Sequence, residues 1–342
     1  MKRLKVGIIG AGRIGKVHAR TLALHPNAAT TVAIADPNRA AADEVARQYG
    51  ISRVAEDAGE IFRSPEIDAV LVCSSTDTHS EFIVQAAQAG KHIFCEKPID
   101  YDLSRIDPAL EAVKHAGVKL QIGFNRRFDA NFARVRRAIE TGEIGRPRLL
   151  HIVSRDPAPP PISYIKSSGG MFLDMTIHDF DMARFLIQDE VEEVYAAAGV
   201  MVDPEIGQAG DVDTAVMTLR FRNGLIGTID NSREAVYGYD QRVEVLGSKG
   251  AIATGNNYPN QAILSTAKEI RRDLPLNFFM ERYAESFAEE LRCFIRSVTE
   301  DTPTLVSGED ARYAVLMGMA ALKSHEQGKP VKVEEVVAVG AR

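Results

Sequence analysis

Short apolar runs alternate with helix-forming segments through the first third of this 342-residue chain. The apolar runs occupy residues 5–9, 31–35, 69–73, 92–95 and 119–122, and the helical patterns occupy 15–24, 39–49, 78–89 and 103–116. Apolar runs without polar alternation predict strands that are buried on both faces, and helices between them predict parallel pairing. We therefore expect a doubly wound α/β domain at the N-terminus.

The pattern changes after about Gly123, where long strand-like segments with few helices begin. Apolar and polar residues alternate over 215–221, and Asn223-Gly224 predicts a tight hairpin turn into 225–229. Further strands are predicted at 242–246 and 251–253, and helices at 129–140, 174–187, 285–298 and 309–327. These patterns predict a C-terminal α+β domain with an open, mainly antiparallel sheet.

The length of the chain is enough for two domains, at roughly 150 residues each. We expect the first domain to cover residues 1–123 and the second to cover 124–342. The helix at about 309–327 is the candidate to pack back on the first domain.

Charge and cysteine content limit the partners and the compartment. The net charge is -6, whereas nucleic acids and anionic membranes are bound through an excess of Lys and Arg, so neither is expected as a partner. No run of 18 apolar residues occurs, and the stretch at 4–10 is too short for a signal peptide. Cys73, Cys95 and Cys293 lack the spacing of a disulfide framework or a zinc site, which favours the cytoplasm.

A glycine-rich turn, Gly10-Ala11-Gly12-Arg13-Ile14-Gly15, follows the first predicted strand and opens a helix. The first glycine permits a sharp turn, the second lets the backbone approach a pyrophosphate, and the third allows close packing of helix on strand. Asp36 ends the second strand, where a carboxylate accepts from a ribose 2'-hydroxyl and repels a 2'-phosphate. The motif predicts a Rossmann domain that prefers NAD to NADP, although the nearby Arg39 weakens that preference.

Two more polar segments follow strands at the edge where ligands of open parallel sheets bind. The segment 74–79 also suits helix capping by Thr76 or Asp77, with Glu81 in place for a capping box, and His79 also suits a surface position. In Cys95-Glu96-Lys97-Pro98, a partly desolvated Lys97 could exchange protons near neutral pH. An exposed structural lysine is the alternative.

Residues 169–181 form the densest polar segment of the second half. On one continuous helix, Asp174, His178 and Asp181 would lie on the same face, so that a carboxylate could orient the imidazole as a general base. A salt-bridged histidine on a helix would look similar, and Asp/His metal ligation lacks a third ligand with suitable spacing. Arg126 and Arg127 lie where the two domains join, and one of them could line a cleft.

Together these segments resemble the Gfo/Idh/MocA oxidoreductases over nearly the whole chain, and within them the inositol 2-dehydrogenase branch. The resemblance rests on the sequences at 10–15, 95–98 and 123–129 (Gly-Phe-Asn-Arg-Arg-Phe-Asp), on Asp36, and on Asp174 with His178. Tyr-Gly-Tyr-Asp-Gln-Arg at 237–242 is similar to the inositol branch in particular.

The resemblance implies an NAD-dependent dehydrogenase that oxidises a ring hydroxyl of a cyclitol, foremost myo-inositol to 2-keto-myo-inositol in inositol catabolism. It implies catalytic roles for Lys97, Asp174 and His178, with the primary base left open between Lys97 and His178. It also implies a homotetramer in which the sheets of the second domains pack together. The candidate cofactor-binding residues are Gly10, Gly12, Arg13, Ile14, Gly15, Asp36, Ser75, Thr76, His79, Glu96 and Lys97. The candidate substrate-binding residues are Arg127, Asp156, Tyr237 and Tyr239, and no metal is expected.

The chain departs from the family at residues 154–157, Ser-Arg-Asp-Pro, where members often carry His-Arg-Asn-Pro. This difference leaves the preferred substrate open among inositol isomers and pyranoses. A regulator that binds NAD without turnover is the alternative from a different functional class.

Overall fold

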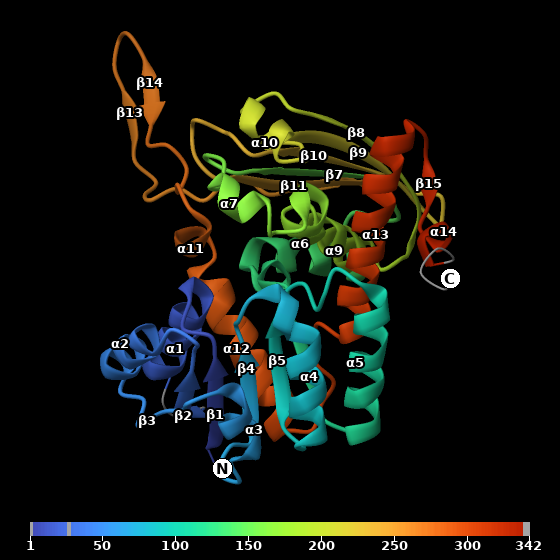
Figure 1. The fold of residues 1–342 in the computed structure, drawn as a ribbon. Coiled ribbons are helices and arrows are strands. Elements are labelled where there is room, and N and C mark those ends of the chain that lie inside the picture. The colour runs from blue at the N-terminus through green and yellow to red at the C-terminus, as the bar shows by residue number, and fades with distance from the viewer. Residues whose placement is uncertain (1–2, 26–28, 338–342) are drawn as a thin grey trace. The chain divides into compact units, whose positions relative to one another are not determined.

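The computed structural model describes residues 3–25 and 29–337 (Figure 1). The chain divides into two compact units: residues up to 125 together with 285–313, and residues 126–284 together with those from 314 onward. The predicted domains differ from these units, because residues 285–313 return to the first unit. The position of the domain boundary, expected after Gly123, stays a prediction.

The first unit contains a six-stranded parallel sheet with the order β3-β2-β1-β4-β5-β6. Its strands are β1 (Leu4–Ile9), β2 (Ala29–Ala35), β3 (Arg53–Val54), β4 (Ala69–Val72), β5 (His92–Glu96) and β6 (Leu120–Gly123). The order reverses at β1, which pairs with both β2 and β4. The expected doubly wound sheet is confirmed. Only β3 escaped prediction, because its two half-buried residues form no apolar run.

Helices connect these strands close to the predicted positions. They are α1 (Arg13–Leu24), α2 (Arg39–Tyr49), α3 (Ala58–Arg63), α4 (His79–Gln88) and α5 (Leu103–Ala116). Caps explain two of the boundaries: the side chain of Asn38 accepts from the N–H of Ala41 at the start of α2, and Gly50 ends that helix in the left-handed conformation. The short α3 has too few residues for a helical period to be visible in the sequence.

A helix from the C-terminal third completes the core of the first unit. This helix, α12 (Ala284–Thr299), contributes Leu291, Phe294 and Ile295 to the same apolar cluster as Ile8 and Phe94. Phe94 and Phe294 meet edge to face with their ring centroids 5.9 Å apart. Hydrophobic burial thus binds a segment distant in sequence to the parallel sheet.

The second unit contains a seven-stranded mixed sheet with the order β12-β11-β7-β10-β9-β8-β15. Its strands are β7 (Pro147–Arg155), β8 (Val191–Gly199), β9 (Thr214–Phe221), β10 (Ile226–Ser232), β11 (Asp240–Gly247), β12 (Ala251–Ala253) and β15 (Val331–Lys332). Within this sheet, the β7–β10 pair is the only parallel one among the described strands, and the other pairs are antiparallel. The expected open, mainly antiparallel sheet is confirmed.

One face of this sheet is buried and the other is exposed. Along β9, Ala215, Met217 and Leu219 are buried, whereas the alternate residues Val216 and Arg220 are exposed. Helices α6 (Ala130–Glu140), α9 (Ile177–Ile187) and α13 (Gly308–Gln327) lie on one side of the sheet in Figure 1. The exposed side is therefore the one that a further molecule could cover.

The helix expected over residues 174–187 is interrupted. Helix α8 (Gly170–Asp174) ends before α9 begins, and the backbone N–H groups of Met175 and Thr176 both donate to the carbonyl of Met171. The hydroxyl of Thr176 donates to Oδ1 of Asn231 over 2.6 Å. The expectation of a continuous helix is wrong, because Asp174 and His178 belong to separate helices.

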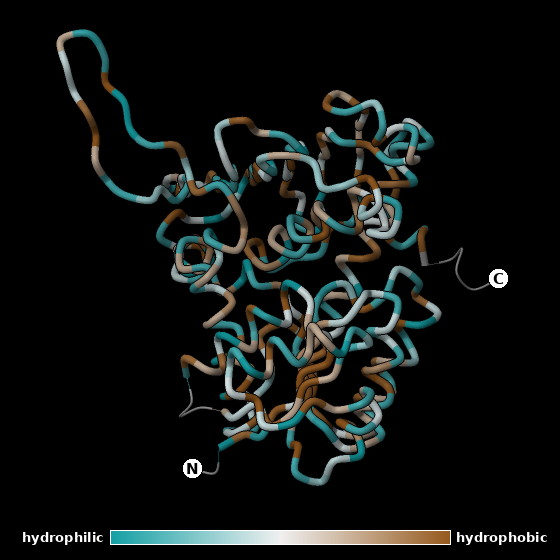
Figure 2. Tube along the Cα trace, turned by 60° about the vertical axis from the view of Figure 1, so that its left-hand side comes forward, coloured by the Kyte–Doolittle hydropathy of each residue, from teal (hydrophilic) through white to brown (hydrophobic). Residues whose placement is uncertain are grey.

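A hairpin of β13 (Ile263–Ser265) and β14 (Ile270–Arg272) extends away from the main sheet of the second unit (Figure 1). Along the tube of Figure 2, hydrophobic and hydrophilic residues alternate in this hairpin. Its Ile263 and Ile270 are largely exposed, at 62% and 77%. The remaining helices are η1 (Thr76–Thr78), η2 (Asn125–Phe128), α7 (Ile162–Ile165), α10 (Pro204–Gln208), α11 (Phe279–Arg282) and α14 (Glu334–Val337).

Candidate active site

The glycine-rich turn joins β1 to α1 in the first unit. Gly10 has a φ of +104°, and a Cβ there would lie 2.4 Å from the carbonyl oxygen of Cys73. A Cβ on Gly15 would lie 2.0 Å from the carbonyl oxygen of Gly10. Both positions therefore require glycine, one for the sharp turn and the other for close packing of helix on strand.

Gly12 lies at the start of α1 and faces open space, since a Cβ there would meet nothing within 4 Å. Its neighbour Arg13 is exposed and Ile14 is half-buried. No side chain of the described residues caps this end of the helix, so its first N–H groups and the positive end of its dipole are available to an anion. This cradle fits the pyrophosphate of a dinucleotide.

Asp36 follows β2, beside the glycine-rich turn. Its Oδ2 accepts from the N–H of Ala11 over 2.6 Å, and its Oδ1 accepts from the N–H of Asn38 over 2.7 Å. A carboxylate has about four acceptor positions, so two remain for ribose hydroxyls. The guanidinium of Arg39 instead contacts Asp43, with Nε 3.2 Å from Oδ1. Both observations favour NAD over NADP.

The segment after β4 forms the short helix η1. The hydroxyl of Thr78 donates to the carbonyl of Ser75 and lies 2.7 Å from the hydroxyl of Ser74. Among the described residues no side chain caps α4, so the predicted capping by Thr76 or Asp77 is wrong. At the carboxyl edge of the sheet, Ser75 is exposed and Thr76 is half-buried.

His79 is buried, with 1% of its surface exposed, so the alternative of a surface histidine is wrong. Its Nδ1 lies 2.7 Å from the carbonyl oxygen of Pro98, and its Nε2 lies 3.0 Å from that of Ser74. The imidazole therefore joins the segment after β4 to the segment after β5. Lys97, which precedes Pro98 through a cis peptide bond, is half-buried at this edge.

The second unit holds a buried polar group on the helix-covered face of its sheet. Arg126 donates to Oδ1 of Asp179 over 2.6 Å, and Asn231 on β10 donates to Oδ2 over 2.9 Å. The hydroxyl of Ser154 on β7 donates to Oε1 of Gln241 over 3.0 Å. These groups fix Asp179, next to His178, within the unit.

Asp174 lies at the end of α8, where three other side chains determine its surroundings. The hydroxyl of Tyr164 donates to its Oδ1 over 2.9 Å, and Nη1 of Arg233 lies 3.7 Å from its Oδ2. Arg233 is 1% exposed and also contacts Asp211, at 3.5 Å. The buried guanidinium thus places a positive charge beside the carboxyl group of Asp174. His178 is half-buried at the start of α9.

The remaining carboxylate of the predicted face, Asp181, binds Arg127 through both oxygens, with Nε–Oδ2 and Nη2–Oδ1 distances of 2.9 and 2.6 Å. Both residues are buried. The guanidinium of Arg127 also lies over the ring of Phe185, 5.3 Å from its centroid. Arg127 is thus part of a buried ion pair, and its contact with substrate stays a prediction.

Asp156 and Tyr239 lie near the same polar group. Burial raises the pKa of Asp156 to about 6, and the charges of Asp174 and Asp179 add to this effect against those of Arg233 and Arg126. Burial likewise raises the pKa of the Tyr239 phenol well above its usual range. The second unit therefore brings together Asp156, Asp174 and Asp179, of which sequence reasoning selected the first two.

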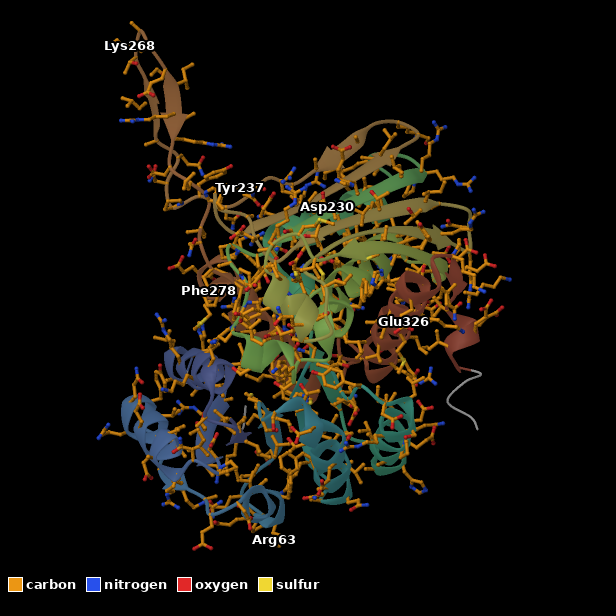
Figure 3. All side chains as sticks on the ribbon, turned by 45° about the horizontal axis from the view of Figure 1, so that its top comes forward. Arg63, Asp230, Tyr237, Lys268, Phe278 and Glu326 are labelled. Carbon is orange, nitrogen blue, oxygen red and sulfur yellow. The ribbon has the colours of Figure 1, made fainter. Side chains whose placement is uncertain are left out.

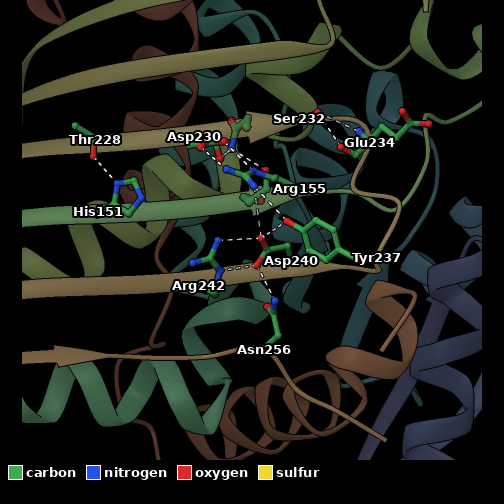
Figure 4. Close-up of polar contacts among 12 residues, drawn as sticks. His151, Arg155, Thr228, Asp230, Ser232, Glu234, Tyr237, Asp240, Arg242 and Asn256 are labelled. Atoms are coloured by element: carbon green, nitrogen blue, oxygen red, sulfur yellow. Dashed lines mark hydrogen bonds and ion pairs between the residues drawn. The ribbon is translucent and has the colours of Figure 1, made fainter. Parts of the chain in front are cut away.

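Tyr237 lies elsewhere, in a charged network on the exposed side of the sheet (Figures 3 and 4). Its hydroxyl donates to Oδ2 of Asp240 over 2.7 Å and accepts from Nη1 of Arg155 over 3.2 Å. Arg155 in turn binds Asp230 on β10. The structure does not bring Tyr237 together with Asp174 and Asp156, and its contact with substrate stays a prediction.

Comparison with known proteins agrees with this arrangement. Residues 4–124 match the oxidoreductase family with an NAD-binding Rossmann fold, and residues 132–253 match the GFO/IDH/MocA C-terminal domain. Myo-inositol 2-dehydrogenase of Thermotoga maritima is 51% identical over 98% of this chain and 100% of its own. The chain belongs to the Gfo/Idh/MocA oxidoreductase family.

Two further relatives of this Gfo/Idh/MocA protein extend the comparison. Inositol 2-dehydrogenase of Rhizobium meliloti is 45% identical over 96% of this chain and 99% of its own. The crystal structure of scyllo-inositol dehydrogenase from Lactobacillus casei with NAD(H) and scyllo-inositol has a TM-score of 0.91 and 30% identity, covering 97% of this chain and 100% of that chain. The protein is thus an NAD-binding oxidoreductase of the group that acts on CH-OH donors.

The sequence did not predict several residues of the polar group in the second unit: Tyr164, Asp179, Asp211, Asn231 and Arg233. Asp179 lies within the polar segment 169–181, but the helical spacing placed only Asp174, His178 and Asp181 on one face. Arg233 lies just after β10. The strand was expected to end at residue 229, so the polar residues Asn231, Ser232 and Arg233 were not assigned to its end. A predicted strand that ends in polar residues is the signal that could have identified it.

We expect this family member to bind NADH at least about tenfold more tightly than NADPH, because Asp36 would repel a 2'-phosphate. Asp36→Ala should reduce the ratio of the NADPH dissociation constant to the NADH dissociation constant, whereas Arg39→Ala should leave this ratio unchanged. The measurement is the dissociation constant of each cofactor by fluorescence titration. Equal or tighter binding of NADPH to the wild type would contradict the assignment.

Asp156 should make stability depend on pH. Its pKa in the folded state, about 6, exceeds the ordinary 3.8, so its stabilising contribution is full below pH 4 and is lost as the pH rises through 6. Asp156→Asn should therefore be more stable than the wild type at pH 7.5, by about 2–3 kcal/mol, and this advantage should shrink towards pH 4. Denaturant unfolding at several pH values measures it.

Asp213 provides a control of opposite sign. Burial raises the pKa of Asp213, but hydrogen bonds from the backbone of residues 201–203 outweigh this and leave it lowered. Asp213→Asn should therefore lose stability at neutral pH, and the loss should fade in acid. The same pH trend in both variants would refute the assignment for Asp156.

Proposed function

We propose that this protein oxidises a ring hydroxyl of an inositol, foremost myo-inositol to 2-keto-myo-inositol, with NAD as the acceptor. The observation that carries the proposal is that the chain is 51% identical to a myo-inositol 2-dehydrogenase over 98% of its length. From the family resemblance we assign the catalytic roles to Lys97, Asp174 and His178. The intact set of proton-handling residues favours an enzyme over a sensor that binds NAD without turnover.

The first unit holds the cofactor in this proposal. Gly12 and the start of α1 receive the pyrophosphate, and Asp36 accepts from the ribose of the adenosine half. Ser75 and Thr76, at the carboxyl edge, are proposed to contact the rest of the cofactor. His79 and Glu96 are proposed to support this edge from the interior, since both side chains are bonded within the unit. When bound, NAD supplies the carbon that accepts the hydride.

The residues of the second unit handle the hydroxyl proton. The imidazole of His178 accepts it as the hydride leaves the ring carbon, and the charge of Asp174 stabilises the resulting imidazolium. Arg233 and Tyr164 hold the carboxyl group of Asp174 in place for this role. The ammonium of Lys97 stabilises the developing alkoxide. Lys97 is the alternative acceptor of the same proton.

Recognition of the ring rests on groups that pair with its hydroxyls. Asp156 and Tyr239 are the proposed substrate-binding residues near the polar group of the second unit. For Arg127 and Tyr237, contact with substrate rests on the family resemblance alone, since Arg127 pairs with Asp181 and Tyr237 lies on the other side of the sheet. An Asp in place of the family's usual Asn accepts hydrogen bonds when ionised but then cannot donate one. Scyllo-inositol, the compound named for one of the relatives, is therefore the alternative substrate to test beside myo-inositol.

We also propose that the protein is a homotetramer of the cytoplasm that serves inositol catabolism. The exposed face of the second sheet supports the assembly, because it carries large apolar side chains at alternate positions: Leu149, Val216, Ile226 and Leu246. Contiguous exposed apolar surface is typical of a face that another subunit covers. The three cysteines are free, as a reducing compartment requires. Within the described residues no helix is long and apolar enough to cross a membrane.

Lys97→Ala and His178→Ala should each lower kcat by roughly a hundred- to ten-thousandfold, because both groups act on the transferring proton. The dissociation constant of NADH should stay within about threefold for His178→Ala, which lies in the other unit. Steady-state kinetics and fluorescence titration measure these quantities. A His178→Ala enzyme with more than about a tenth of wild-type activity across neutral pH would remove His178 as the base.

The substrate is tested with a panel of myo-, scyllo- and chiro-inositols and glucose, with NAD as acceptor. We expect the highest kcat/KM with an inositol and a difference of at least about fivefold between isomers, since an unpaired hydroxyl costs about 1–3 kcal/mol. Asp156→Asn should change the order of the isomers. Absence of activity on every inositol would refute the proposed function, and an unchanged order would refute the role of Asp156.

A further inference from the structure

Three acid–base residues meet in the interior of the first unit, beneath the helix that the glycine-rich turn opens. His18 lies on α1, Glu96 is the last residue of β5, and Glu290 lies on α12. Their nitrogen and oxygen ligand atoms all lie within 4.8 Å of one another. We call these three residues the buried acid cluster.

The cluster is almost completely removed from solvent. His18 and Glu290 are 0% exposed, and the side chain of Glu96 is 13% exposed. The rings of Phe94 and Phe287 stand edge-on to the imidazole of His18, at 5.0 and 6.0 Å between centroids. Two carboxyl groups therefore share surroundings in which charge is poorly solvated.

Two residues of the cluster, His18 and Glu96, are hydrogen-bonded to each other. Nε2 of His18 lies 2.6 Å from Oε1 of Glu96, the distance of a charge-assisted hydrogen bond. Glu290 has no such partner: among the described residues neither of its oxygens, nor Nδ1 of His18, has a hydrogen bond. No Lys or Arg of the described residues forms an ion pair with Glu290 or Glu96.

A cation or a proton could compensate the second carboxyl group. Two ligands of a tetrahedral zinc ion, each about 2.0–2.2 Å from the metal, lie roughly 3.4 Å apart. The 2.6 Å contact between His18 and Glu96 is too short for a shared metal. A proton needs no such separation, and burial together with the charge of Glu96 raises the pKa of Glu290 well above its usual range.

The remaining titratable neighbours supply no positive charge. Cys73, after β4, feels the charges of both Glu96 and Glu290, and burial raises the pKa of its thiol well above the usual range. Burial and the charge of Glu96 do the same to the pKa of Cys95 on β5. On β6, Gln121 donates to the backbone carbonyl of Glu290 over 2.8 Å. Within residues 3–25 and 29–337, no Lys or Arg is thus paired with either carboxyl group, and a bound proton is the simplest way to remove the second negative charge.

We propose that Glu290 is a neutral carboxylic acid that donates a hydrogen bond to the Glu96 carboxylate, making Glu290 and His18 positioning residues for the strand end that carries Lys97. The bond forms directly after a small shift or through one bridging water, since the separation is at most 4.8 Å. Glu96 is then held by His18 on one oxygen and by Glu290, while its carboxyl group packs on Gly123, where a Cβ would lie 2.9 Å from Oε2.

The consequence for Lys97 rests on its proposed catalytic role. Lys97 directly follows Glu96, so a shift of the Glu96 backbone moves the ammonium group relative to the substrate. Misplacement by about 1 Å costs on the order of a hundredfold in rate. The protonation of Glu290 itself does not depend on that role and is observable without any substrate.

The first experiment determines the protonation state in the full-length protein. Infrared difference spectra on H/D exchange at pH 7 should show the carbonyl band of a buried carboxylic acid in the wild type. The band should be absent from Glu290→Gln and present in Glu289→Gln, which changes an exposed neighbour on the same helix. Absence of the band from the wild type, or one equivalent of bound metal by elemental analysis, would overturn the proposal.

The second experiment tests positioning. Glu290→Gln, which remains neutral and can donate, should keep kcat within about twofold, whereas Glu290→Leu should lower kcat at least tenfold with an unchanged KM for NAD. Glu290→Gln should also be the more stable protein at high pH, because the wild-type acid must then ionise while buried. Equal losses of kcat in the Gln and Leu variants would overturn the positioning role. A wild type inactive on every inositol would instead refute the proposed function, leaving the infrared result intact.

Discussion

The proposed cofactor-binding residues of the first unit depend on the parallel pairing of β1 with both β2 and β4. Because the three strands run in the same direction and in register, their carboxyl ends lie side by side. Gly10, Asp36 and Ser74 thereby become neighbours although they are far apart in sequence. The carbonyl of Cys73 leaves no room for a side chain at Gly10, so the turn, the sheet and the path of the cofactor constrain one another.

In the second unit, buried arginines lie against buried carboxyl groups. Arg126 and Arg233 are nearly inaccessible, and each faces a carboxylate: Asp179 in one case and Asp174 in the other. Burying such pairs is expensive unless each charge is compensated. Burial nevertheless raises the pKa of both Asp156 and Asp179, because the nearby guanidinium groups do not fully offset the loss of solvation. These two aspartates therefore keep a proton to a higher pH than an exposed aspartate does.

Much of the first unit could be predicted from the sequence, because apolar runs, caps and glycines act locally. The turn at 10–15 carries its reasons in the residue types themselves. The break at Met175–Thr176 could not be predicted, because it depends on Asn231, which is distant in sequence. The same holds for Arg233 and for the return of α12, both of which are tertiary effects. Tyr237 matched a motif, yet residue identity alone could not tell which face of the sheet it would join.

The return of α12 also determines the order in which the protein can fold. When the ribosome has made residues 1–125, the six strands of the first sheet exist, but the apolar surface that Leu291, Phe294 and Ile295 will cover is still exposed to water. Residues 126–284 of the second unit are synthesised before that surface is covered. A nascent chain therefore carries an incomplete nucleotide-binding unit through about half of its synthesis. Folding of the first unit becomes a late event that requires a nearly finished chain.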